Sequence, residues 1–191
     1  MYVVVGLPGA GKSTVLREVA SRGYEIINFG DVMFKTGVEL FGNRINTRDD
    51  MRYNLTFSEY KRLQQQTGKE IKRLIDRSSN PDKVIIDTHA IIYTPDGYIP
   101  GLPDHVISEW EGLSKLILIT VPYQDLIERR KNDTSRKREM ISLEEYERQV
   151  NLTLNVITHV SCMTGCSVYL VENRNGRLED TVKKMIDVLE E

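Results

Sequence analysis

The sequence lacks most features that mark membrane, secreted or nucleic-acid-binding proteins. No apolar run in its 191 residues approaches the roughly 18 residues of a membrane span. The formal net charge is −2 and no long basic run is present, so we expect neither a nucleic acid nor a membrane surface as a partner. The chain passes at once into a strand-like segment, and we therefore expect no cleaved signal peptide.

Cysteine is also scarce. Cys162 and Cys166 lie near the end of a predicted helix, with no second cysteine pair and no nearby His-x-His. A structural zinc site needs more ligands than this, so none is expected. We predict two small buried thiols in a reducing, cytoplasmic environment.

What the chain does contain, five residues from its start, is a phosphate-binding motif. Residues 6–13 match G-x-x-x-x-G-K-[ST] at every position, after the apolar run 2–5 and before a helix-spaced segment that reaches Ala20. The glycines allow backbone N–H groups to point at phosphates, and the start of a helix adds further unpaired N–H groups. We predict that Lys12 reaches the β- and γ-phosphates and that the Ser13 hydroxyl binds Mg²⁺.

Strand-like and helical segments alternate along the rest of the chain. This pattern predicts one domain of the α/β class over residues 1–191, with a parallel sheet between helical layers. Capping boxes at Thr56–Glu59 and Ser142–Glu145 mark the starts of two long helices, and the second is predicted to end at Gly165. Residues 64–66 are interpreted as an exposed turn. The predicted strands are residues 2–5, 24–28, 83–87, 114–121 and 167–172.

Asp87 and His89 follow a buried strand and are the first candidates beside the phosphate loop. A carboxylate at this position holds Mg²⁺ directly or through water in such proteins, although an aspartate at a strand end can also cap the next segment. His89 would face the same cleft, either as a ligand or in a structural hydrogen bond.

Arginines form the second set of candidates. Arg48 and Arg52 are four residues apart, so in a helical turn they would share a face and could clamp one phosphate. Arg129, Arg136 and Arg138 surround a polar, basic insert at about 131–141, which we interpret as a lid over the phosphates. Each arginine alone could be a solvated surface charge; together, beside a phosphate loop, they favour a kinase.

Several of these segments resemble the archaeal-type adenylate kinases, from the first strand to the last helix. The resemblance is carried by the loop at 5–14, by Asn28-Phe29-Gly30-Asp31, by Asp87-Thr88-His89 and by the proline-rich run at 94–103. The loop alone suits any nucleotide-using family, whereas the last two motifs are much more specific. The family departs from this chain at two positions, where relatives tend to carry a basic residue and this chain has Tyr93 and Leu154.

The resemblance implies a P-loop NTPase-type fold with a five-stranded parallel core, a short lid and an AMP-side insertion at about 30–80. It implies reversible, Mg²⁺-dependent transfer from ATP to AMP, and a homo-oligomer, commonly a trimer. By similarity, the ATP-binding residues are Gly6, Leu7, Pro8, Gly9, Ala10, Gly11, Lys12, Ser13 and Thr14. The AMP-binding residues are Asn28, Gly30, Asp31, Met33, Arg48, Arg52, His89 and Gly101. The catalytic residues are Lys12, Arg129, Arg136 and Arg138, and the metal-binding residues are Ser13 and Asp87.

Two other functions remain open at this point. A kinase for a small-molecule hydroxyl needs a base near the attacking oxygen, and Asp31 could supply it. An adenylate-kinase-like ATPase could instead use nucleotide binding as a switch in assembly or regulation. The absence of a large basic face weighs against the second alternative.

Overall fold

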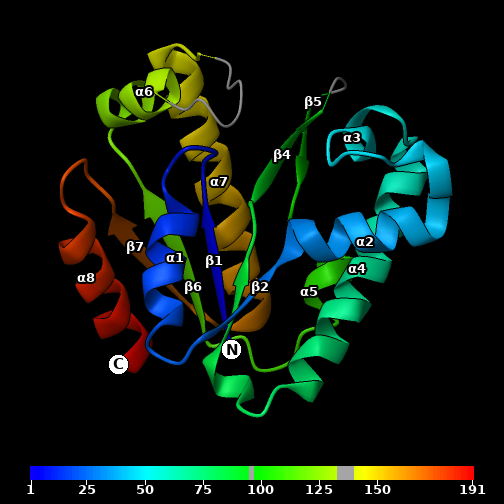
Figure 1. Ribbon diagram of the computed structural model, residues 1–191, viewed down its shortest axis with the longest axis horizontal. Coiled ribbons are helices and arrows are strands. Elements are labelled where there is room, and N and C mark those ends of the chain that lie inside the picture. Colours follow the sequence, from blue (N-terminus) through cyan, green and yellow to red (C-terminus); the bar gives the residue numbers. More distant parts are fainter. Residues whose placement is uncertain (95–96, 133–139) are drawn as a thin grey trace.

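A five-stranded parallel sheet forms the centre of the computed structural model, which describes residues 1–94, 97–132 and 140–191 (Figure 1). The strands lie in the order β2-β3-β1-β6-β7, and every neighbouring pair is parallel. The predicted fold class is therefore confirmed. The strands are β1 (Tyr2–Gly6), β2 (Glu25–Asn28), β3 (Val84–Asp87), β6 (Lys115–Thr120) and β7 (Ser167–Glu172).

Helices cover both faces of this sheet because alternate strand residues point to opposite sides. On β1, Val3 and Val5 belong to a core that includes α2, α4, α5 and α7, whereas Val4 belongs to a second core with α1, α6 and α8. The helices are α1 (Lys12–Ala20), α2 (Phe29–Phe41), α3 (Asp50–Tyr53), α4 (Phe57–Arg77), α5 (Asp104–Ile107), α6 (Tyr123–Asn132), α7 (Leu143–Thr164) and α8 (Leu178–Glu190), with 3₁₀ turns η1 (Gly42–Arg44) and η2 (Pro81–Lys83).

The helix ends largely follow the predicted capping signals. Thr56 and Glu59 form the complete capping box of α4. Ser142 caps α7 by accepting from the Glu145 N–H, but the Glu145 carboxylate accepts a hydrogen bond from Tyr98. Gly165 ends α7 in the left-handed region at φ 74°, as predicted.

The segment between β2 and β3 is helical and contains α2, η1, α3 and α4. Arg48 lies before α3, so it and Arg52 are not on one helix as their spacing suggested. The prediction for residues 64–66 was wrong at Gln64, which is buried and donates to the Pro100 carbonyl at 3.0 Å. The spacing of apolar residues does not indicate that a polar side chain such as Gln64 is buried against a single hydrogen-bond partner.

Two short strands between β3 and α5 were not predicted from the sequence. The antiparallel strands β4 (Ile91–Thr94) and β5 (Gly97–Pro100) make a hairpin that rises beside α7 (Figure 1). Tyr98 of β5 donates to Glu145 and accepts from Gln149 at 3.1 Å, which attaches the hairpin to α7.

Cys166 is buried as expected, but the prediction for Cys162 was wrong because its side chain is exposed on α7. Both thiols are free. Among the described residues, no helix is long and apolar enough to cross a membrane.

Candidate functional site

A cleft of about 1190 Å³ opens at the carboxyl ends of β1, β2 and β3. Ligand sites of open parallel sheets lie at this edge. The cleft is larger than the 300–1,000 Å³ of an ordinary small-molecule pocket, so it has room for two nucleotides. The predicted site residues that line it are Leu7, Pro8, Gly9, Gly11, Lys12, Ser13, Thr14, Asn28, Gly30, Asp31, Met33, Arg48, Arg52, Asp87, His89, Gly101 and Arg129.

Among the described residues, two predicted ones do not line the cleft. Gly6 and Ala10 are buried within the loop and contribute backbone only. Arg136 and Arg138 lie outside the described residues, as does most of the predicted lid at 131–141.

The first wall of the cleft is the phosphate loop, which adopts the tight turn that its glycines predict. Gly9 and Gly11 have φ of 97° and 84°, in the region that glycine occupies without strain. A Cβ on Gly11 would lie 2.4 Å from Nδ2 of Asn173, so this position also requires glycine for space. We call residues 6–14, together with Arg129, Arg130 and Asn173, the loop wall.

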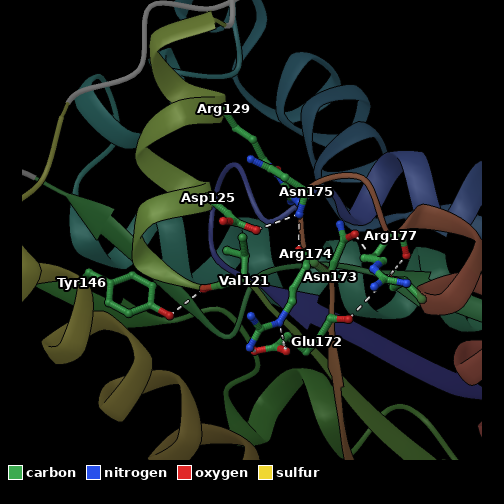
Figure 2. A network of polar contacts seen from close by, with 10 residues as sticks. Val121, Asp125, Arg129, Tyr146, Glu172, Asn173, Arg174, Asn175 and Arg177 are labelled. Atoms are coloured by element: carbon green, nitrogen blue, oxygen red, sulfur yellow. Dashed lines mark hydrogen bonds and ion pairs between the residues drawn. The ribbon is translucent and has the colours of Figure 1, made fainter.

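Side chains from distant elements hold the carbonyl oxygens of the loop. The Ala10 carbonyl accepts from Arg129 at 3.0 Å and from the buried Asn173 carboxamide at 2.8 Å. Arg129 also donates to the Asn173 carbonyl at 2.8 Å and to the Asn175 side chain at 2.7 Å; these three residues are labelled in Figure 2. These bonds fix the carbonyl side of the loop, opposite to the N–H groups that such a loop directs at a phosphate.

Arg130 is a second arginine of the loop wall and was absent from the predicted site. It is 8% exposed and donates to the Pro8 carbonyl at 3.0 Å. It lies one helical turn after the buried Leu126, so the helical spacing of α6 could have indicated its inward direction. Burial lowers the pKa of Arg129 from its ordinary value, yet an arginine with so high a reference pKa stays charged.

Lys12 and Asp87 form an ion pair at the centre of the cleft. Lys12 is 8% exposed and Asp87 5% exposed, and Nζ lies 3.2 Å from Oδ1. Asn28 donates to the other carboxylate oxygen at 2.8 Å. The two charges are therefore compensated within the protein, as buried charges must be.

His89 contacts the start of the phosphate loop. Its Nδ1 lies 2.8 Å from the Gly6 carbonyl, and because a carbonyl only accepts, Nδ1 carries the proton. The structural hydrogen bond considered for His89 is thus present. Gly101 packs under this residue so closely that a Cβ would lie 2.0 Å from the His89 carbonyl oxygen.

The opposite wall comes from α2 and α3. Arg48 is ion-paired with Asp31, and Arg52 lies 3.8 Å from Asp49. Both arginine side chains are 39% exposed, whereas Arg130 of the loop wall is buried. We call residues 28–33 and 48–52 the helix wall.

Buried side chains of α4 form the floor beside the helix wall. Burial raises the pKa of Tyr60 to about 12, so its hydroxyl is neutral at physiological pH and can donate a hydrogen bond. Gln64 lines the same region. The sequence placed Tyr60 on the apolar stripe of its helix, and spacing alone could not show that it borders the cleft.

The two departures from the family pattern lie away from this centre. Tyr93 is 56% exposed on β4 and stacks edge-on with Tyr98, with ring centroids 5.6 Å apart. Leu154 is partly buried and packs against the core that α7 covers. Neither residue lines the cleft.

The oxygen groups at the centre of the cleft suit Mg²⁺ rather than a softer metal. Asp87 Oδ1 is buried and has no hydrogen bond within the part of the chain that the structure describes, while Ser13 is exposed in the cleft. Within those ranges no group of three His, Cys, Asp or Glu residues could hold a metal alone. Mg²⁺ is commonly bound by one or two protein oxygens plus substrate phosphates, and the residues fit that pattern.

Comparisons with known proteins agree with this geometry. A family model described as an AAA domain matches residues 5–147. The chain is 32% identical to an adenylate kinase of Methanocaldococcus jannaschii over 99% of this chain and 97% of that protein. It is 34% identical to an adenylate kinase of Methanothermobacter thermautotrophicus over 100% of this chain and 99% of that protein.

Solved structures show the same fold at greater distance. A shikimate kinase from Bacteroides thetaiotaomicron superposes with a TM-score of 0.63 at 14% identity, over 100% of this chain and 98% of that one. This likeness concerns the P-loop kinase fold alone. The full-length sequence similarity and the motif-bearing cleft show that the chain belongs to the archaeal adenylate kinase family.

Proposed function

We propose that this enzyme catalyses ATP + AMP ⇌ 2 ADP in the cleft between the loop wall and the helix wall. The observation that carries the proposal is the facing of a phosphate loop and a pair of arginines across one cleft, with Lys12 and Asp87 between them. Family membership supports the same reaction.

In the forward reaction, a phosphate oxygen of AMP attacks the γ-phosphorus of ATP. The new P–O bond forms as the bond from the γ-phosphorus to the β–γ bridging oxygen breaks, and the leaving ADP keeps that electron pair. The AMP oxygen is already anionic, so positioning and charge neutralisation matter more than a general base. This fits a cleft rich in arginine.

On the donor side, N–H groups of the phosphate loop and of the first turn of α1 are proposed to surround the phosphates of ATP, and Lys12 neutralises charge on the β- and γ-phosphates. Lys12 would then exchange part of its contact with Asp87 for the phosphates. Arg129 supports the loop carbonyls while its position in the cleft lets it face ATP. Arg136 and Arg138 are proposed to close over the phosphates from the lid.

On the acceptor side, Arg48 and Arg52 are proposed to hold the AMP phosphate. Both are exposed to the cleft, and their carboxylate partners are surface groups that a phosphate can displace. The remaining acceptor residues are Asn28, Gly30, Asp31, Met33, His89 and Gly101, which line the same cleft.

Mg²⁺ is the proposed cofactor, bound through Ser13 and Asp87 together with the phosphates. When bound, it supplies charge neutralisation on the transferred group. The protein contributes a buried carboxylate oriented by Asn28 and an exposed hydroxyl at the first turn of α1.

The structure weakens the hydroxyl-acceptor alternative. Asp31 is ion-paired with Arg48, so its carboxylate is already engaged by a cation of the helix wall and is not held ready for an acceptor hydroxyl. A switch ATPase would hydrolyse ATP without needing AMP, and the assay below separates it from a transferase.

A cytoplasmic homo-oligomer, with a trimer as the expectation from the family, completes the proposal. Two free thiols support a reducing compartment. The exposed Leu170 on the edge strand β7 and Met163 on α7 support an apolar contact between subunits. Light scattering coupled to size exclusion would measure the subunit number.

The test of function is ADP formation by the purified protein with MgATP and each of AMP, CMP, UMP and GMP. We expect fast ADP formation with AMP only. ATP loss that does not depend on any nucleoside monophosphate would contradict the proposal.

A further inference from the structure

Asn28 lies where the two walls meet. It is the last residue of β2 and the N-cap of α2, and its register partner on the neighbouring strand β3 is Asp87. The two side chains therefore leave adjacent parallel strands at the same edge of the sheet and both line the cleft.

The carboxamide of Asn28 uses both of its ends within the protein. Its oxygen accepts from the Asp31 N–H at 3.0 Å, and its nitrogen donates to Asp87 Oδ2 at 2.8 Å. The reverse orientation would place two oxygens against each other and two donors against each other, so the partners determine the assignment. Because Asp87 Oδ1 lies 3.2 Å from Lys12 Nζ, three contacts link α2 to the phosphate loop.

This pattern distinguishes Asn28 from an ordinary N-cap. Serine, threonine and aspartate also cap helices well, but none of them can accept from the helix and donate to a carboxylate through two separate groups. The terminal torsion of an aspartate is broad, so a buried carboxylate needs a partner to fix its plane. A neutral amide fixes the plane of the Asp87 carboxylate without neutralising its negative charge, which remains available to Lys12 and to a cation.

We propose that Asn28 is a positioning residue that orients Asp87 and couples the acceptor-side helix α2 to the carboxylate on the donor side. The inference rests on the proposed function and revises one part of it: Asn28, counted there among the acceptor residues, acts through Asp87 and not by a polar contact with AMP. Residues that orient metal ligands commonly change affinity or activity by about 10- to 100-fold when replaced.

Three substitutions separate the two hydrogen bonds. Asn28→Ser keeps a capping oxygen but lacks the donor that reaches Asp87; Asn28→Ala loses both; Asn28→Asp caps the helix but sets a carboxylate against Asp87. Ser142→Ala, which removes the N-cap of α7, is the matched control because Ser142 does not line the cleft. Thermal unfolding, kcat and both KM values are measured for each variant.

We expect Asn28→Ser to lower kcat by about 10-fold or more, with the KM for AMP changed less than about threefold. Asn28→Asp should lower kcat further. Asn28→Ala and Ser142→Ala should both lower Tm by about 2–4 °C as lost caps, but only Asn28→Ala should also lower kcat. Unchanged kcat in Asn28→Ser would show that Asn28 is only a cap, and a raised KM for AMP at constant kcat would show a direct acceptor contact; either result overturns the proposal.

A binding measurement keeps the inference separate from the proposed function. Calorimetric titration with ATP in EDTA and with MgATP gives the gain in affinity that the metal provides. We expect Asn28→Ser to reduce that gain by about 10-fold while metal-free ATP binds with unchanged affinity. An unchanged gain would overturn the inference, whereas a wild-type enzyme that makes no ADP from AMP would contradict the proposed function alone.

Discussion

The loop wall and the helix wall face the same cleft but are built differently. The loop wall is backbone held from behind by the side chains of Arg129, Arg130 and Asn173, which are bonded to loop carbonyls. The helix wall presents Arg52 from the short helix α3 and Arg48 from the segment before it, each 39% exposed and paired with a surface carboxylate. The first wall is preorganised for one ligand, whereas the second can exchange its ion pairs for a phosphate.

The largest effect is expected at Lys12, between the walls. Lys12→Ala should lower kcat about 10³-fold because it removes charge compensation in the transition state. Unfolding should remain cooperative with a lower Tm, since the buried Asp87 loses its cationic partner. Steady-state kinetics and thermal unfolding test this, with the exposed Lys184→Ala on α8 as the control; near-normal turnover would contradict the role of Lys12.

Asn173→Asp tests the preorganisation of the loop wall. The change replaces the donor to Ala10 by an oxygen at 2.8 Å from that carbonyl, so the loop should shift. A displacement of this kind can cost about 100-fold, and we expect that loss in kcat/KM for ATP with the KM for AMP unchanged. Equal losses for both substrates would mean that the two walls are not independent. The control Asn151→Asp, at an exposed position of α7, should have little effect.

Arg52→Ala tests the helix wall. Loss of a charge-assisted hydrogen bond of about 1.5–3 kcal/mol should raise the KM for AMP about 10-fold or more and leave the KM for ATP nearly unchanged. Arg73→Ala, on the exposed side of α4, is the control. A rise in the KM for ATP alone would show that Arg52 contacts the donor nucleotide and not AMP.

The smallest effect concerns the support of the helix wall at low pH. Hydrogen bonds from Arg44 and from Thr56 lower the pKa of Glu59 from 4.5 to about 2. A lowered pKa stabilises the folded state above the unfolded value, so this contribution is present above pH 4.5 and is lost as the pH falls toward 2. The hydrogen-exchange protection factors of residues 42–60 should fall over this range, and Glu59→Gln should reduce that pH dependence; identical profiles for the two proteins would exclude a contribution of Glu59.

The turn of the phosphate loop could be predicted from the sequence because its chemistry is local. A glycine-rich turn between a strand and a helix can be recognised from consecutive residues, and the strand-end Asp87 follows from the same logic. Asn173 could not be found this way, since it meets Ala10 only after folding brings β7 to the loop. The motif specified the turn but not the side chains behind it.

The prediction of the helix wall depended far more on the family resemblance than on local sequence patterns. Spacing placed Arg48 and Arg52 on one helix, yet only Arg52 belongs to α3. The hairpin β4–β5 was not predicted because its prolines and glycines interrupt the alternation of apolar and polar residues that marks a strand. Cys162 was expected to be buried, but it lies on the exposed face of α7. Long-range packing decides each of these features, and single-sequence periodicity does not report it.

The proposed reaction requires the two walls to hold two nucleotides at once. Calorimetric titration with a two-substrate mimic, in which ATP and AMP are bridged through their phosphates, tests this requirement. We expect one mimic to bind per chain, saturating mimic to exclude both ATP and AMP, and the mimic to bind more weakly to both Lys12→Ala and Arg52→Ala. Binding of AMP to the mimic-saturated enzyme, or a mimic affinity that Arg52→Ala leaves unchanged, would contradict it.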